Sequence, residues 1–232
     1  MMDIEALRDL TLYKYFTDLQ FAEDFCNGHL RLGTLHGYKK CEDDLRGDRG
    51  EGDFTFNAFT KKVNGSPTEE ESRILQRFGI GYSHVENVQF SMNPTIISTT
   101  DRWVLCTATQ QLNQKEREVF GEYCIAINGH SLLVGLIEGI TKHYKFYQIN
   151  CDHVKYIERT AEYTEILKIE PPFIKPAIPF GNQFEFRYTI LAGDNATRKN
   201  GIVYFDKNEY EPIFIDSDTI ANACTKLYKT GI

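Results

Sequence analysis

One segment of the chain, residues 183–191, constrains the fold more than any other, because polar and large apolar side chains alternate along it. The polar positions are Gln183, Glu185, Arg187 and Thr189, and the apolar positions are Phe184, Phe186, Tyr188 and Ile190. Successive side chains of a β-strand point to opposite faces, so the pattern predicts a strand with one face buried in a core. The polar face then meets either solvent or a cleft, and the alternation alone favours ordinary half-exposed charges.

The other periodic segments of the 232-residue chain are short and change type repeatedly, and no internal repeat or long linker separates them. We expect further strands at residues 12–16, 29–33, 103–107, 122–127, 144–149, 153–158, 202–205 and 213–215. We expect helices at residues 19–27 after Thr17 or Asp18, 69–78 after Thr68, 132–140 after Ser131 and 218–228 after Ser217, and a short helix ending at Gly121. The chain is therefore predicted to be one α+β domain, residues 1–232, in which residues 144–158 form a hairpin.

The charge and the cysteines limit the possible partners and the compartment. The 33 acidic side chains outnumber the 26 basic ones, and a net charge of −7 argues against a generic grip on nucleic acid or anionic lipid. The first residues lack a secretory signal, and no apolar run approaches the roughly 20 residues of a membrane span, so we expect no membrane association. Six singly placed cysteines are typical of reduced thiols in a cytoplasmic protein. Only Cys151 and His153 approach the spacing of metal ligands, so we expect no metal site.

An acidic segment begins at Glu42 and ends at Asp53, with the sequence EDDLRGDRGEGD. Its carboxylates, arginines and glycines can neither bury a face nor propagate a helix, so the segment predicts a loop. A solvated, self-paired loop is the simplest interpretation. The alternatives are a surface that docks on a partner, or a lid whose Arg46 and Arg49 turn inward over a bound pyrophosphate.

Three polar features are candidates for a site. Glu185 has Gln183 and Arg187 on its own face of the predicted strand, and a carboxylate beside a guanidinium stays ionised at neutral pH. Thr107 and Thr109 end the strand that begins at Trp103, and their hydroxyls share one face. Lys14 lies inside the first predicted strand, LYKY, which begins at Leu12. The chain has no nucleophile elbow, Walker loop or Gly-x-Gly-x-x-Gly motif, so a P-loop hydrolase and a Rossmann dehydrogenase are not expected.

Three features follow one another along the chain: a first strand with a polar residue, a Thr-x-Thr strand and a Gln183-x-Glu185 strand. In this order the chain resembles one branch of the ADP-ribosyltransferases, whose strands carry Arg, Ser-x-Ser and Gln-x-Glu. The resemblance implies an α+β fold with a split, mostly antiparallel sheet that holds NAD between its halves. It also implies transfer of ADP-ribose to a protein or nucleic-acid acceptor. Glu185 and Gln183 would be catalytic, with Thr107 and Thr109 supporting Glu185. The implied NAD-binding residues are Lys14, Tyr13, Thr107, Thr109 and Arg187.

The chain also resembles an uncharacterised bacterial and prophage family whose members open with Leu-Tyr-Lys-Tyr and later carry a Glu-x-Arg strand. The matching residues here are Leu12 to Tyr15, and Glu185 with Arg187. Because Lys14 stands where an Arg or His is expected and threonines replace the serines, a second hypothesis stays open. In that hypothesis the chain is a non-enzymatic phage or prophage protein that docks on a host protein through its acidic surface.

Overall fold

The structure is a computed structural model, and it describes residues 4–41, 47–77, 85–161, 171–193, 196–199, 202–205 and 210–229. Strand β7 (Trp103–Ala108) lies at the centre of its largest sheet. Strand β13 (Glu185–Ala192) pairs with every residue of β7, from Glu185 opposite Ala108 to Ile190 opposite Trp103. On the other edge of β7, β2 (His29–Thr34) pairs only with Trp103 and Val104, and β1 (Thr11–Phe16) only with Ala108. The sheet therefore splits along this edge, between Val104 and Ala108.

Each branch of the split continues through further strands. Beyond β1 come β8 (Tyr123–Asn128) and β17 (Cys224–Lys229), and beyond β2 comes β16 (Ile213–Asp216). Strand β9 (Phe146–His153) covers the outer edge of β13. Every pairing in this eight-stranded sheet is antiparallel, which confirms the expected α+β class with a mostly antiparallel sheet.

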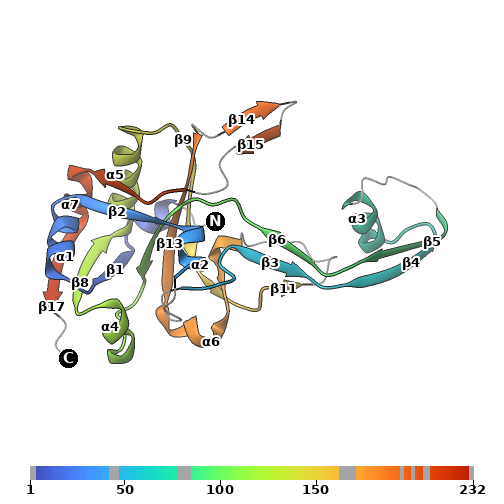
Figure 1. The fold of residues 1–232 in the computed structure, drawn as a ribbon, viewed down its shortest axis with the longest axis horizontal. Coiled ribbons are helices and arrows are strands. Elements are labelled where there is room, and N and C mark those ends of the chain that lie inside the picture. The colour runs from blue at the N-terminus through green and yellow to red at the C-terminus, as the bar shows by residue number, and fades with distance from the viewer. Residues whose placement is uncertain are drawn as a thin grey trace.

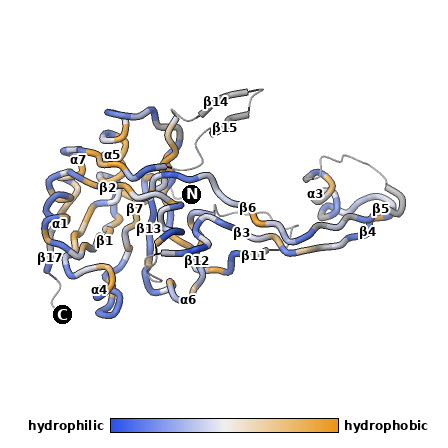
Figure 2. The backbone as a smooth tube through the Cα atoms, in the orientation of Figure 1, coloured by the Kyte–Doolittle hydropathy of each residue, from blue (hydrophilic) through white to orange (hydrophobic). Residues whose placement is uncertain are grey.

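Helix α1 (Leu19–Cys26) connects the two branches, because it follows β1 and precedes β2. The Asp18 side chain caps it, as the sequence predicted, by accepting from the Gln20 N–H. Helices α5 (Gly129–Thr141) and α7 (Asp218–Ala223) lie beside α1 on the side of the body away from the long arm (Figure 1). Hydrophobic segments run through these helices and the strands beside them (Figure 2), and the buried core includes Leu12, Leu32, Ile125, Ile127, Leu132, Phe186 and Tyr188. Short helices α2 (Leu35–Lys39) and α4 (Gln114–Phe120) complete the body.

A long arm extends from the body (Figure 1). It begins at β3 (Asp53–Phe56) and continues through β4 (Phe59–Gly65), α3 (Glu69–Arg77), β5 (Val85–Met92) and β6 (Thr95–Ser98). Strand β4 pairs with β5, and β3 pairs with β6 and, in parallel, with β11 (Thr160–Ala161). Thr68 and Glu71 form the expected reciprocal cap of α3. The sequence analysis did not foresee the arm strands.

The predicted hairpin at residues 144–158 is wrong. Strand β9 is continuous from Phe146 to His153 and takes its partner from β13, 33 or more residues later. The following short strand, β10 (Lys155–Tyr156), pairs in parallel with β12 (Ile174–Lys175). Strand β12 belongs to the proline-rich connector that also holds η2 (Pro171–Phe173), α6 (Ala177–Phe180) and η3 (Gly181–Gln183). A distant partner strand thus replaced the local turn.

Two helix boundaries also differ from the prediction. Helix α5 begins at Gly129, because Asn128, and not Ser131, accepts from a backbone N–H of its first turn. Helix α7 ends at Ala223, and the chain from Cys224 onward forms β17 on the open edge of β8. The segment 202–205 is a strand as expected, β15 (Ile202–Phe205), paired with β14 (Ala196–Lys199). The short N-terminal helix η1 (Ile4–Leu7) packs on α5.

All six cysteines are free thiols. Within the described ranges, no helix has both the length and the apolar composition needed to cross a membrane. In the same ranges, no group of three or more His, Cys, Asp or Glu side chains is placed to hold a metal ion.

Candidate functional site

A cavity of about 650 Å³ lies where the sheet splits. Its walls come from β1, β2 and β7, from α1, and from the region between β12 and β13, and Phe214 of β16 lies at its edge. The volume is in the range of cofactor and small-molecule sites, roughly 300–1,000 Å³. The split itself creates the cavity, because the strand edge of β7 has no strand partner between its contacts with β2 and β1.

The structure brings together six of the seven residues that the sequence singled out. The six that line the cavity are Tyr13, Lys14, Thr107, Gln183, Glu185 and Arg187. Thr109 is not among the lining residues. Tyr13 and Glu185 both lie opposite Ala108, on its two sides, so their side chains share one face of the sheet. Residues from distant parts of the sequence therefore meet in one place.

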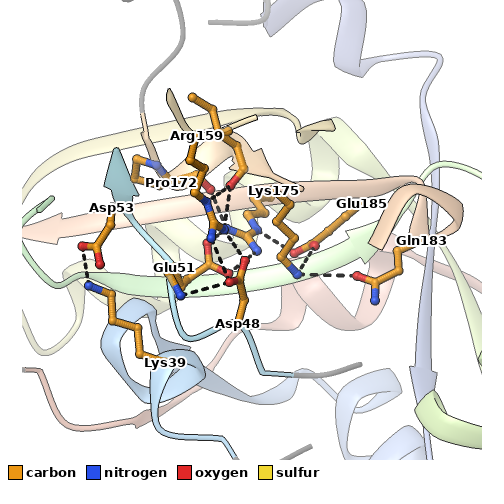
Figure 3. A network of polar contacts seen from close by, with 12 residues as sticks. Lys39, Asp48, Glu51, Asp53, Arg159, Pro172, Lys175, Gln183 and Glu185 are labelled. Carbon is orange, nitrogen blue, oxygen red and sulfur yellow. Dashed lines mark hydrogen bonds and ion pairs between the residues drawn. The ribbon is translucent and has the colours of Figure 1, made fainter. Parts of the chain in front are cut away.

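Glu185 and Arg187 form the floor of the cavity, and both are buried. Nε of Arg187 lies 2.6 Å from Oε1 of Glu185. Nζ of Lys175, on β12, lies 2.8 Å from Oε2 of Glu185, and Lys175 is also buried (Figure 3). The expectation of half-exposed surface charges is wrong, because β13 lies inside the sheet and the segments around Lys175 and Glu51 cover its polar face.

The second partner of Arg187 is Glu51, which is fully buried. The two terminal nitrogens of Arg187 donate to the two carboxylate oxygens of Glu51, at 2.6 and 3.0 Å. This bidentate pair joins the acidic segment to the cavity floor. Two cations and two anions thus balance: Arg187 and Lys175 against Glu185 and Glu51.

The expectation of a solvated loop is wrong for the described half of the acidic segment. Asp48 is buried and pairs with the guanidinium of Arg159, and Asp53 lies 2.6 Å from Nζ of Lys39 (Figure 3). The arginine and lysine partners come from other segments, so the loop composition could not reveal them. Glu42 to Arg46 lie outside the described residues, so the expected contact of Arg46 with a bound pyrophosphate also lies outside them.

Electrostatics keep Glu185 ionised. Burial by itself would raise the pKa of its carboxyl, but Arg187 and Lys175 outweigh burial and hold this pKa well below its usual range. The pKa of Arg187 is raised well above its usual value, since burial is outweighed by Glu185 and Glu51. Oε2 of Glu185 is buried and lies 2.8 Å from the ammonium nitrogen of Lys175. A buried, ionised carboxylate therefore lies at the floor of the cavity.

Cys106 and Tyr38 lie beside this carboxylate. Burial, with the nearby charge of Glu185, raises the pKa of the Cys106 thiol to about 12, so the thiol is neutral and a poor nucleophile. Cys106, burial and Glu185 likewise raise the pKa of Tyr38. Both groups are therefore neutral at physiological pH, and the ionised groups on the floor are the Glu185, Arg187 and Lys175 side chains.

Gln183 reaches the floor from η3, where its side-chain oxygen lies 3.5 Å from Nζ of Lys175. The next residue, Phe184, has a φ of +46° in the left-handed region and is 37% exposed. The prediction that Phe184 begins the buried face of the strand is wrong, because this left-handed residue interrupts the alternation and the strand begins at Glu185.

The two threonines bind backbone and do not support Glu185. The Thr107 hydroxyl donates to the Phe186 carbonyl at 3.0 Å, and the Thr109 hydroxyl donates to the Phe184 carbonyl at 3.2 Å. Thr107 is the register partner of Phe186, so its side chain lies on the face of the sheet opposite Glu185. The supporting role assigned to them from the sequence is therefore wrong, and they hold β7 to the chain around β13.

Lys14 lies at the split and is half-buried. Its Nζ donates to the Cys106 carbonyl at 2.9 Å, in the part of β7 that has no strand partner on that edge. Nζ also lies 5.9 Å from the centre of the Phe16 ring. Lys14 thus places a positive charge in the cavity wall.

The charge of the lining is opposite in sign to that of the whole chain. The lining cations are Lys14, Arg31, Lys175 and Arg187, and the lining carboxylates are Asp24 and Glu185. With Glu51, which pairs with Arg187 on the floor, counted among the carboxylates, an excess of one positive charge remains in a chain whose net charge is −7. Such a local field favours an anionic ligand.

The sequence analysis missed Lys175, Glu51 and Tyr38. Lys175 stands in the run FIKPAIPF, where a single charge among apolar residues and prolines is a weak sign of a buried ion pair. Nothing in the local sequence separates Glu51 from its acidic neighbours. Comparison with known proteins adds nothing to these assignments: no family model, no curated protein and no solved structure matches this chain.

Proposed function

We propose that this chain binds NAD in the cavity at the split of its sheet and is an ADP-ribosyltransferase-like protein. One observation carries the proposal: the residues singled out in three distant segments line one cavity, with an ionised carboxylate oxygen of Glu185 at its floor. A volume of about 650 Å³ suits a ligand of this class. The excess of positive charge around the cavity suits its phosphates.

The chemistry of the floor fits NAD in particular. NAD supplies a glycosidic bond to nicotinamide whose cleavage leaves a positively charged ribose and takes the bonding electrons to the leaving group. The Glu185 carboxylate is the anionic acceptor for a ribose hydroxyl in this proposal, and its charge stabilises a nearby cation. Lys175 and Arg187 hold the carboxylate in place.

The remaining residues take positioning roles in this proposal. Gln183 lies beside Lys175 and orients the incoming nucleophile of a protein or nucleic-acid acceptor. Lys14 offers its ammonium to a phosphate, as a point donor without the two-pronged geometry of arginine. Arg187 acts through Glu185, because its nitrogens are already committed to Glu185, Glu51 and the Pro172 carbonyl.

Release of nicotinamide from NAD, followed by chromatography, tests the proposal. We expect release by the wild-type protein, and a loss of about 100-fold or more in Glu185→Gln, the size typical for one electrostatic group of a site. Because Glu185 is buried, each variant is first checked for folding by circular dichroism. Thr109→Ser, outside the cavity lining, is the matched control and should keep full release.

Two results would count against the proposal. Unchanged release by a folded Glu185→Gln would remove Glu185 from the reaction. No release together with no NAD binding by the wild type would leave the docking hypothesis, in which the chain acts on a host protein without catalysis. The described acidic residues Asp48, Glu51 and Asp53 do not favour that alternative, because their charges are used inside the protein.

A further inference from the structure

Two exposed phenylalanines stand at the edge of the cavity. Phe21 of α1 is 60% exposed and Phe214 of β16 is 74% exposed, and both line the cavity. Large apolar rings left in water at the edge of a concave site are typical of ligand-binding surfaces. The two rings come from different elements, so the exposure of both is not explained by the periodicity of one helix or one strand.

A cation lies directly beside Phe214. Arg31 of β2 is its register partner, so the two side chains are cross-strand neighbours on one face. Arg31 is exposed, lines the cavity and forms no ion pair with the described residues. The next basic side chain on this face, His29, is different, because it already pairs with Asp216. Arg31 is thus the available charge at this edge.

The two ends of the cavity therefore differ in chemistry. The floor presents the Glu185 carboxylate, and the edge presents two exposed aromatic rings, one of which lies beside a guanidinium. A ring face suits stacking by a flat base, and a guanidinium suits a phosphate group. Asp24 of α1 also lines the cavity, and its charge disfavours a second anion deeper along that helix.

We infer that Phe21, Arg31 and Phe214 form a subsite for the purine nucleotide end of the ligand, with the base on the rings and its phosphate on Arg31. This inference rests on the proposed function and adds an orientation to it. The adenosine end of NAD lies at the edge of the cavity, and the nicotinamide riboside end points to Glu185.

Calorimetric titration with two probes tests the subsite. ADP-ribose carries the adenosine end, and nicotinamide riboside carries only the other end. We expect Phe214→Ala and Arg31→Met each to weaken binding of ADP-ribose and NAD by about tenfold, the effect of losing one stacking or charged contact. Binding of nicotinamide riboside should not change. Both side chains are exposed, so the variants should fold.

Matched controls come from exposed residues away from the cavity. Leu19→Ala removes an exposed apolar side chain of α1 that does not line it, and Arg73→Met removes a cation of α3 on the arm (Figure 1). Neither control should alter the affinity for ADP-ribose. Equal weakening by the controls would show that the effect is not specific to the subsite.

The outcomes separate the two claims. If the wild type binds NAD but both subsite variants bind ADP-ribose as tightly as it does, the subsite is wrong and the proposed function stands. The subsite is also wrong if the variants lose nicotinamide riboside and keep ADP-ribose, since the orientation is then reversed. If the wild type binds neither NAD nor ADP-ribose, the proposed function fails and the subsite falls with it.

Discussion

Arg187 reaches back along its own strand to Glu185, so that its Nε lies 2.6 Å from Oε1 of the carboxylate two residues earlier. Both side chains are buried. Residues two apart on a strand share a face at a separation of about 7 Å, which the long arginine side chain spans. The charge of Glu185 at the cavity floor is therefore stabilised by Arg187 of the same strand, and Arg187 is itself held by its ion pair with Glu51.

Removing the charge of Glu51 should destabilise the protein. In Glu51→Gln the buried guanidinium of Arg187 keeps only Glu185 as a charged partner, and loss of one member of a buried ion pair costs about 3–5 kcal/mol. Urea unfolding should show a loss of about 3 kcal/mol in the free energy of unfolding. Glu69→Gln, in an exposed pair on α3, is the control and should change it by less than about 0.5 kcal/mol. Similar values for the two variants would show that the Arg187 pair does not stabilise the fold.

Stability should fall in acid because of Glu185. Its pKa is depressed in the folded protein, so below pH ~4.3, the ordinary glutamate value, the unfolded chain takes up a proton that the folded protein does not. The stabilisation is present above that pH and is lost as pH falls toward the folded pKa. Urea unfolding at pH 7 and pH 3.5 should show a smaller loss in Glu185→Gln than in the wild type. An equal loss in the two proteins would assign the acid sensitivity to other carboxyls, such as Asp48.

Two histidines should titrate on opposite sides of the ordinary value. The hydrogen bond to Asp216 raises the pKa of His29, and burial lowers the pKa of His153. In a proton NMR titration we expect the midpoint of His29 above 6.5 and that of His153 below 6.5. Asp216→Asn should return His29 toward 6.5 and leave His153 unchanged. If the midpoint of His29 were the same in the wild type and in Asp216→Asn, the cross-strand pair of His29 with Asp216 would not be formed in solution.

Gly121, at the end of α4, should tolerate no side chain. Its φ is +117°, and a Cβ there would lie 2.0 Å from the Phe16 carbonyl oxygen. Gly121→Ala should therefore cost more than about 1 kcal/mol of stability in thermal or urea unfolding. Gly181→Ala is the matched control, because a Cβ at Gly181 meets nothing within 4 Å. A neutral Gly121→Ala would mean that α4 and β1 are not in close contact.

The sequence predicted elements well where local chemistry determines them. The Asp18 cap, the reciprocal cap of Thr68 with Glu71 and the stop at Gly121 are each specified within a few residues, and each is present. Errors occurred where a distant strand supplied the hydrogen bonds. The segment from Cys224 onward has a helical pattern but forms a strand on the free edge of β8. Strand β9 pairs with β13, and not with the segment that directly follows it in the sequence.

For the candidate site, the sequence named the right face of β13 but the wrong surroundings. Periodicity places Glu185 and Arg187 together and cannot show what covers them. The covering side chains, Glu51 and Lys175, come from an acidic run and a proline-rich connector, and both segments have compositions typical of exposed loops. Burial of these charges follows from long-range pairing, which no local pattern encodes.

Calorimetric titration of NAD into the wild-type protein and into Lys14→Met tests the central claim most directly. If NAD occupies the cavity, the wild type should bind one NAD per chain. Lys14→Met, which keeps the apolar stem, should then bind roughly tenfold more weakly, because one charged hydrogen bond is lost. Lys40→Met, at an exposed lysine outside the cavity lining, should bind as the wild type does. No heat of binding with the folded wild type, or equal affinities of the wild type and Lys14→Met, would contradict the account.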